Sequence, residues 1–197
     1  MIILGLTGSI GMGKSTTAEM FKERGIPVYD ADAAVHNLYA KDGAAVKPIS
    51  ELVKGVVADG AVDRAALRDA VFKDETLLPK IETTVHPLLV QSRKHFFSDN
   101  RDAPIVLLDI PLLFETGGDK NVHKIVVVTA PPDVQRERVL SRPDMSEERF
   151  HAILAKQMPD EEKRERADFI INTGEGLDAA GVAVDVILKV LRAEAKE

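Results

Sequence analysis

Short apolar runs, each followed by turn or polar residues, recur along the chain with helical patterns between them. The first run, Ile2–Leu6, is rich in residues typical of a strand that is buried on both faces. Similar runs predict strands over 26–30, 105–109, 125–129 and 169–172. Pro27 lies at the start of the second of these strands. Because proline cannot donate to a sheet ladder, it favours an edge strand or the first residue of a strand.

Helical spacing fills the intervals between these runs. Ala18, Met20 and Phe21 recur at helical intervals after a glycine-rich loop, and Gly25 is typical of a C-terminal stop. Near the end of the sequence, apolar residues follow one face of an amphipathic helix, at Leu177, Val184, Ile187, Leu188 and Leu191. Strands that alternate with helices predict βαβ units, and therefore an α/β fold with a five-stranded parallel sheet.

Two stretches depart from this rhythm. Residues 36–100 contain no convincing strand but several helical patterns, one of which follows Asp63, a candidate N-cap. Residues 141–166 are strongly charged and also helical. Because there is no internal repeat and no low-complexity linker, we expect residues 1–197 to form a single domain. Its core would comprise about 1–35, 101–140 and 167–197, and the two helical stretches would be insertions.

Composition narrows the class of protein. Hydrophobic residues make up 45% of the 197 residues and charged residues 29%, as in ordinary globular proteins. No apolar run approaches the roughly 20 residues that cross a bilayer, and the first residues lack the flanks of a signal peptide. We therefore expect a cytoplasmic protein without a membrane partner. The sequence has no cysteine, which excludes disulfides, thiolate metal sites and cysteine nucleophiles.

The charge of the chain bears on its partners. The formal net charge is −6, whereas a general nucleic-acid binder needs a basic face that releases counterions. Two tyrosines, seven phenylalanines and no tryptophan offer few platforms for stacking bases. We therefore expect no nucleic-acid partner. An anionic small ligand remains compatible with a local cluster of donors inside an acidic chain.

A glycine-rich loop follows the first strand. It reads GSIGMGKST from Gly8 to Thr16, and Gly8, Gly13, Lys14 and Ser15 fit the pattern G-x-x-x-x-G-K-[ST] between a strand and a helix. The dinucleotide pattern G-x-G-x-x-G fails, because threonine stands at position 16 where that pattern requires glycine. The loop therefore predicts a nucleoside-triphosphate site rather than a turn that binds nothing.

Each residue type in the loop has a physical reason. Glycines let the backbone curl so that successive N–H groups point at phosphate oxygens, and the following helix adds its positive N-terminal end. Lys14 can reach the β- and γ-phosphates, and the Ser15 hydroxyl can ligate Mg²⁺. The residues expected to bind the triphosphate are Gly11, Met12, Gly13, Lys14, Ser15 and Thr16.

Acidic residues follow two of the predicted strands. Asp30 and Asp32 come at the end of the second strand, at the carboxyl edge of the sheet, where a carboxylate can take the proton of an acceptor hydroxyl. Their position alone leaves a second interpretation open, in which either aspartate caps the next helix. Asp109 ends the run IVLLD, a Walker-B type of pattern whose aspartate holds Mg²⁺. His36, as a lone histidine, is more typical of packing or hydrogen bonding than of catalysis.

Taken together, these motifs resemble those of dephospho-CoA kinases. The segments that carry the resemblance occur in the family's order over nearly the whole chain: LTGSIGMGKST, DADAAVH, VDRAALRDAVF, HPLL, IPLLFE, VVVTAPPDVQRERVLSR and ADFIINTG. The resemblance implies a P-loop kinase that transfers a phosphoryl group from ATP to the ribose 3′-hydroxyl of dephospho-CoA, the final step of CoA synthesis. It also implies that residues 36–100 bind the acceptor and that residues 141–166 form a closing lid.

The resemblance also implies roles for residues on the acceptor side. Asp32 matches the family's proposed base, which leaves Asp30 to support Mg²⁺ or the loop. The alternative for His86 is that it caps a helix whose first turn contains Pro87. The residues that the resemblance places on the acceptor are Asp32, His36, Arg64 and His86.

On the nucleotide side, the resemblance points to arginines of the lid region. Arg138 and Arg142 fall where such kinases place arginines around the adenine and the transferring phosphate. The planar fork of arginine suits that task, because it binds phosphate at two points and stays charged. Asn172 and Gly174 fall where the family passes the chain beneath the adenine ring. The expected catalytic set is therefore Asp32, Lys14 and Arg142.

The sequence departs from the family pattern at one position. Many members have arginine four residues before the lid glutamine, whereas Ile153 precedes Gln157 here. If that arginine normally contacts phosphate, another arginine such as Arg149 must replace it. Glu115 in PLLFE is compatible with a structural role.

Other functions fit the residues less well. The nearest alternative is a P-loop kinase for another small hydroxylated acceptor, since its core would be identical. A nucleotide-dependent switch is disfavoured because the guanine-selecting pattern N-K-x-D is absent. A zinc hydrolase is disfavoured because the five histidines lack ligand spacing and no cysteine is present.

Overall fold

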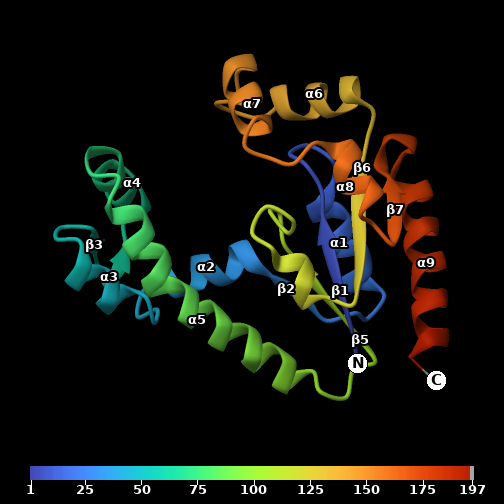
Figure 1. The fold of residues 1–197 in the computed structure, drawn as a ribbon, viewed down its shortest axis with the longest axis horizontal. Helices are drawn as coiled ribbons and strands as arrows, with labels where there is room; N and C mark the ends of the chain where they lie inside the picture. Colours follow the sequence, from blue (N-terminus) through green and yellow to red (C-terminus); the bar gives the residue numbers. More distant parts are fainter. Residues whose placement is uncertain (196–197) are drawn as a thin grey trace. The chain divides into compact units, whose positions relative to one another are not determined.

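The computed structural model describes residues 1–195, which form two compact units (Figure 1). The first unit comprises Met1–Tyr29 together with the described residues from Asn100 onward, and the second comprises Asp30–Asp99. Each unit has a hydrophobic core of its own. In the described part of the chain, no helix is long and apolar enough to cross a membrane.

The first unit is built on a five-stranded parallel sheet, as predicted. Its strands lie in the order β2-β5-β1-β6-β7. Their bounds are β1 Ile2–Thr7, β2 Val28–Asp30, β5 Ile105–Asp109, β6 Lys124–Thr129 and β7 Phe169–Asn172. β2 is an edge strand that begins directly after Pro27, which agrees with the expectation drawn from that proline.

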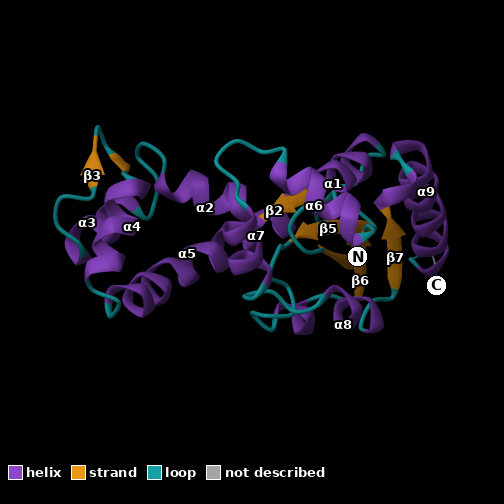
Figure 2. Ribbon diagram, turned by 90° about the horizontal axis from the view of Figure 1, so that it is seen from above, coloured by secondary structure: helices purple, strands orange, loops and turns teal. Residues whose placement is uncertain are grey.

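Helices cover both faces of this sheet. Those of the first unit are α1 Lys14–Glu23, α6 Pro132–Leu140, α7 Glu147–Leu154, α8 Asp160–Glu165 and α9 Leu177–Glu194, with short 3₁₀ turns η1 Gly118–Asn121 and η2 Thr173–Glu175. α1 and α9 pack on one face and α8 on the other (Figure 2). As expected, Gly25 terminates α1: the helix ends at Glu23 with Arg24 as its C-cap, Gly25 follows with a φ of 79°, and the Ile26 N–H donates to the Phe21 carbonyl.

The core of the first unit lies between the sheet and the pair α1 and α9. The apolar face predicted for the last helix is buried at Val184, Ile187, Leu188 and Leu191, but Leu177 is 68% exposed. Leu177 is the first residue of α9, and it lines a pocket instead of contacting the sheet. The spacing of Leu177 correctly assigned it to the apolar face of α9, but this first residue of the helix lies beyond the buried part of that face.

The second unit is mainly helical. Its elements are α2 Ala31–Tyr39, α3 Val46–Leu52, β3 Val57–Ala58, β4 Ala61–Val62, α4 Arg64–Lys73 and α5 Leu77–Asp99. The predicted cap of α4 is present, because an Asp63 carboxylate oxygen accepts the N–H groups of Ala65 and Ala66 at 2.9 and 3.0 Å. The core of this unit is contributed by Ala45, Ile49, Val53, Val56, Val62, Leu67, Ile81 and Val85.

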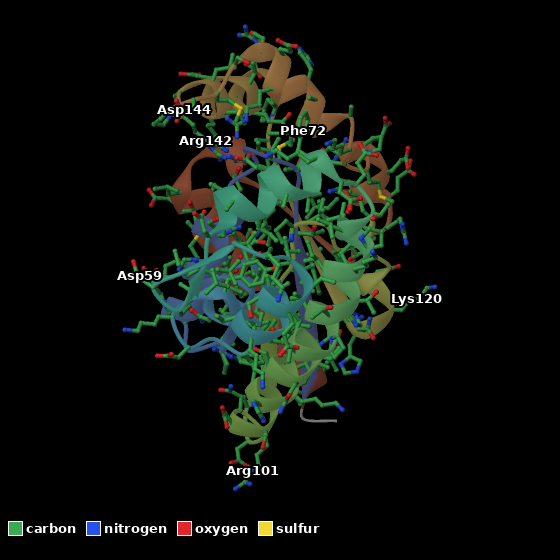
Figure 3. The ribbon with its side chains drawn as sticks, turned by 90° about the vertical axis from the view of Figure 1, so that its left-hand side faces the viewer. Asp59, Phe72, Arg101, Lys120, Arg142 and Asp144 are labelled. Carbon is green, nitrogen blue, oxygen red and sulfur yellow. The ribbon has the colours of Figure 1, made fainter. Side chains whose placement is uncertain are left out.

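The expectation of no strand in residues 36–100 is wrong in one place. β3 and β4 form a small antiparallel hairpin that turns through Asp59 and Gly60, whose φ angles are 50° and 79° (Figure 3). Asp-Gly is the preferred sequence for a tight hairpin turn of this kind, because both central residues need positive φ. The strands are only two residues long, so their apolar pattern alone could not reveal them.

The interpretation of His86 as a helix cap is also wrong. α5 runs without interruption from Leu77 to Asp99 and contains Pro87 in its interior. Proline is disfavoured in the interior of a helix, because it lacks the N–H group that would donate one of the helical hydrogen bonds. The helix nevertheless continues because apolar residues on both sides of the proline pack into the core of the second unit, Ile81 and Val85 before it and Leu88 after it.

Candidate active site

The glycine-rich loop connects β1 to α1. A Cβ on Gly8 would lie 2.3 Å from a Val128 side-chain carbon and 2.8 Å from the Val128 carbonyl oxygen, so only glycine fits there. Gly11 and Gly13 adopt φ angles of 80° and 87°, which side chains disfavour. Gly13 is the N-cap of α1, and the N–H groups in the first turn of a helix have no acceptor within the helix. These donors belong to Lys14, Ser15 and Thr16.

Other side chains hold the backbone of this loop. Gln157 Oε1 accepts the Ile10 N–H at 3.0 Å, and Gln135 Nε2 donates to the Ile10 carbonyl at 2.7 Å. The Thr173 hydroxyl donates to the Met12 carbonyl at 2.9 Å. Three backbone groups of the loop are thereby hydrogen-bonded to side chains of the protein itself.

Two of the predicted residues meet at the base of the loop. Lys14 Nζ lies 2.5 Å from Asp109 Oδ1, and the Asp109 carboxylate is almost fully buried. The contact follows from the sheet, because Asp109 is the last residue of β5 and pairs with Leu6 of β1. The Lys14 ammonium and the Asp109 carboxylate therefore form an ion pair at the base of the loop.

A pocket of about 280 Å³ opens beside the loop. The pocket is lined by Gly11 and Gly13 and by Arg138 and Arg142, the two arginines that the sequence analysis expected on the nucleotide side. The remaining lining residues come from α1, η2 and α9: Thr16, Thr17, Met20, Thr173, Gly176, Leu177 and Ala180. The pocket thus joins backbone donors, two guanidinium groups and an apolar wall in one cavity.

Thr173 is a residue of the candidate site that the sequence analysis missed. It is buried, its hydroxyl holds Met12, and Arg138 donates to its Oγ1 and to its carbonyl oxygen, both at 2.9 Å. A Cβ on Gly13 would come within 3.1 Å of its side chain. The only signal in the sequence was its place directly after Asn172, at the end of a strand.

Asn172 and Arg142 have different surroundings. Asn172 caps η2: its Oδ1 accepts the Gly174 N–H at 3.0 Å, and its Nδ2 donates to Glu175 at 2.7 Å. It is not among the residues that line the pocket, and its contact with adenine stays a prediction. Arg142 is exposed in the connection between α6 and α7, close to Asp144 (Figure 3).

In the second unit, the two aspartates of DAD differ in their contacts. Asp30 is the N-cap of α2, because its Oδ1 accepts the Ala33 N–H at 2.9 Å. Asp32 is exposed in the first turn of α2. His36 follows Asp32 by four residues and therefore lies on the same face of the helix. The cap is thus assigned to Asp30, and the Asp32 carboxylate is left open to solvent.

The other two predicted acceptor residues are also exposed in the second unit. Arg64 is the first residue of α4, and His86 lies in α5. Burial raises the pKa of Tyr39, and the nearby positive charge of Arg64 opposes this rise. Arg64 therefore lies close to the end of α2, whereas the role of His86 stays a prediction.

Within the first unit, Glu115 contacts the second half of the charged stretch 141–166. Glu115 Oε1 lies 2.8 Å from Lys163 Nζ and accepts the Met158 N–H at 2.8 Å. Burial raises the pKa of Glu115, but the close Lys163 ammonium and hydrogen bonds from backbone N–H groups outweigh it, so that the pKa falls below its ordinary value. Arg149 donates to the Asp144 carbonyl at 2.9 Å, and its replacement of the missing family arginine stays a prediction.

The comparisons with known proteins agree with this geometry. The sequence model of the dephospho-CoA kinase family matches residues 2–178. A dephospho-CoA kinase of Mesorhizobium japonicum is 56% identical over 196 residues, which is 98% of each chain. The crystal structure of TT1252 from Thermus thermophilus has a TM-score of 0.81 at 36% identity, covering 98% of this chain and 97% of that one. The dephospho-CoA kinase of Campylobacter jejuni has a TM-score of 0.72 at 27% identity, covering 98% of both chains.

Proposed function

The chain belongs to the dephospho-CoA kinase family, a family of kinases in CoA biosynthesis, and from this premise we propose its reaction in detail. It transfers the γ-phosphoryl group of ATP to the ribose 3′-hydroxyl of dephospho-CoA. The bond between the γ-phosphorus and the β–γ bridging oxygen breaks, a bond to the ribose oxygen forms, and the products are ADP and CoA. The hydroxyl proton leaves to a base.

The observation that carries the proposal is the pocket beside the glycine loop. It is lined by Gly11, Gly13, Arg138 and Arg142, and the first turn of α1 supplies further N–H donors. Such donors bind phosphate oxygens and stabilise the charge that moves during phosphoryl transfer. We infer that the phosphates lie in the loop and that the nucleoside enters the pocket.

Lys14 has to change partner when ATP binds. In the free protein it pairs with Asp109 at 2.5 Å. The β- and γ-phosphates offer its ammonium a stronger negative charge. The Asp109 carboxylate, once released, becomes an acceptor for another cation.

The donor set fits Mg²⁺ as the companion of ATP. The Ser15 hydroxyl and the Asp109 carboxylate are hard oxygen ligands at the same end of the sheet. Among residues 1–195 no cluster of three or more His, Cys, Asp or Glu could hold a metal alone, which suits an ion that shares its coordination with substrate phosphates. When bound, Mg²⁺ neutralises phosphate charge.

Asp32 is proposed as the base. Its carboxylate is exposed and its neighbour Asp30 already caps α2. A positioned carboxylate takes the acceptor proton as the phosphoryl group arrives. We further propose that His36, Arg64 and His86, all exposed in the second unit, bind dephospho-CoA.

A steady-state assay with mass detection of the product tests this function. ATP, Mg²⁺ and dephospho-CoA should give CoA whose added phosphate is on the ribose 3′-oxygen. A panel of other small alcohols, including sugar acids and nucleosides, forms the comparison. A kcat/KM more than tenfold higher for one of those alcohols would contradict the assignment. ATP hydrolysis without any phosphorylated product would favour a nucleotide-dependent switch.

A further inference from the structure

One lysine in the charged segment after α7 is fully buried. α8 reads DEEKRE, and its side chains are otherwise exposed or partly exposed, but the Lys163 side chain has an exposed fraction of 0%. Burying an ammonium group costs several kcal/mol unless it is paired. Its partner is Glu115, at 2.8 Å, whose side chain is only 16% exposed.

A buried pair of this kind is a poor way to stabilise a fold. Apolar residues of similar volume do as well or better, because the two charges must give up their hydration. Three polar atoms at this place, Glu115 Oε2, Asp160 Oδ1 and Lys163 Nζ itself, are buried without a hydrogen bond in the described structure. Lys163 therefore meets Glu115 Oε1 as an ion pair and not through an aligned hydrogen bond. The pair therefore calls for an explanation other than stability.

The contacts of Glu115 lead to the glycine loop. The same carboxylate oxygen that meets Lys163 accepts the Met158 N–H at 2.8 Å. Gln157, the preceding residue, uses its side-chain oxygen to accept the Ile10 N–H at 3.0 Å. The hydrogen bond at the Met158 N–H restrains the peptide group that joins Gln157 to Met158, and with it the backbone from which the Gln157 side chain extends.

We propose that Lys163 is a positioning residue for ATP binding, acting through Glu115 and Gln157 on Ile10 of the loop. With its N–H and carbonyl both satisfied by glutamine side chains, Ile10 is held in one orientation. The neighbouring N–H groups are then directed at the phosphates before ATP arrives, so less ordering is needed on binding. The proposal deepens the proposed function and requires from it only that the loop binds ATP.

The test measures ATP affinity by calorimetric titration without an acceptor. Lys163→Met should weaken the affinity about tenfold, roughly the worth of one lost hydrogen bond, and Gln157→Ala should do the same. In the double variant the two losses should not add, because both act through the same contact. Lys189→Met is the matched control: Lys189 is exposed on α9, and ATP affinity should not change.

A second measurement separates positioning from general damage. Amide exchange of Ile10 in the free protein should become faster in Lys163→Met, while amides of the core strands β1 and β6 exchange as in the wild type. In steady state the KM for ATP should rise with little change in the KM for the acceptor.

Clear outcomes would overturn the proposal. Wild-type ATP affinity in a folded Lys163→Met protein would do so, as would additive losses in the double variant. If Lys163→Met does not fold, Glu115→Leu with Lys163→Met removes both charges and should fold; normal ATP affinity in that protein would equally exclude a positioning role. If the wild-type protein does not bind ATP, the proposed function is refuted instead. If the protein binds ATP but phosphorylates an acceptor other than dephospho-CoA, the comparison of ATP affinities between wild type and variants still tests the positioning role of Lys163.

Discussion

Asp30 and Asp32 are two residues apart in the sequence, but their side chains have different surroundings. Asp30 ends β2 and Asp32 follows it by two residues, and both could have capped α2 or served as a base. Backbone geometry separates them, because Asp30 has the extended φ and ψ of an N-cap, −87° and 113°, and its carboxylate accepts the Ala33 N–H. No pattern of residue types could have made that choice.

We therefore expect opposite results from two matched substitutions. Asp32→Asn should keep ATP affinity and lower kcat by roughly 10²–10⁴, the usual worth of a general base. Asp30→Asn should retain turnover, since asparagine caps helices as well as aspartate does. Rapid-quench and steady-state assays measure both. Near-normal turnover in Asp32→Asn would remove it from catalysis, and a large loss in Asp30→Asn would indicate a role in binding Mg²⁺.

At the same scale, the sequence identified the loop glycines, Lys14 and Asp109 because their spacing is a local property of the chain. The sequence analysis missed Thr173 because its place in the site depends on contacts with residues far away in sequence, Met12 and Arg138. A hydroxyl that joins such distant segments leaves no spacing pattern. Its position is known only once β6 and β7 are paired.

At the scale of elements, buried strands were the easiest to predict. Each of the five strands of the main sheet is a short apolar run that ends in polar or turn residues, and its ends were found within two residues. The hairpin β3–β4 was missed because two-residue strands carry almost no pattern. α5 passes through Pro87 because packing on both sides outweighs the local preference.

The segment predicted as a lid divides into two parts. α8 is tied to the core, since Asp160 accepts the Thr129 hydroxyl at 2.8 Å and Lys163 pairs with Glu115. α7 packs on α6, with Arg136 paired to Glu147. Within the segment, Gln157 accepts a hydrogen bond from the glycine loop and Asp160 accepts one from β6.

We expect ATP to slow amide exchange mainly in residues 141–155. Closure over a nucleotide excludes water and orders the mobile part, whereas the part after Gln157 is already held. Hydrogen exchange followed by mass spectrometry, with and without ATP, resolves the two parts. Equal exchange throughout 141–166 in both states would count against a closing lid. Slowing confined to α8 would mean that α8, and not residues 141–155, closes over the nucleotide.

At the scale of the whole molecule, each unit has a separate core. The residues that line the pocket beside the glycine loop all belong to the first unit. The predicted acceptor residues all belong to the second. Stability and nucleotide affinity should therefore respond independently to substitutions in the second core.

Leu67→Ala tests this independence. Leu67 is 7% exposed in the core of the second unit, and the cavity should lower the free energy of unfolding by about 2–5 kcal/mol. ATP affinity, measured well below the unfolding transition, should stay at the wild-type value. Val186→Ala, at an exposed position on α9, is a control that should affect neither. Weaker ATP binding in Leu67→Ala would show that the units are energetically coupled.

Acid should weaken the whole protein through Glu115. Its pKa in the native state lies below the ordinary 4.5, so its contribution to stability is fully present above about pH 4.5 and is lost as the pH falls towards the native value. Urea unfolding between pH 7 and pH 3 measures this loss. In Glu115→Gln the loss of stability over that range should be smaller. An unchanged pH dependence would mean that other carboxylates account for the acid sensitivity.

The ion pair between Lys14 and Asp109 has a further consequence for selectivity. Because the Lys14 ammonium is paired with a carboxylate, it offers little net attraction to small oxyanions such as sulfate. Only a ligand with the greater charge of a triphosphate competes well with the aspartate. Sulfate should accordingly be a weak competitor of ATP, and the substitution Asp109→Asn should make it a stronger one.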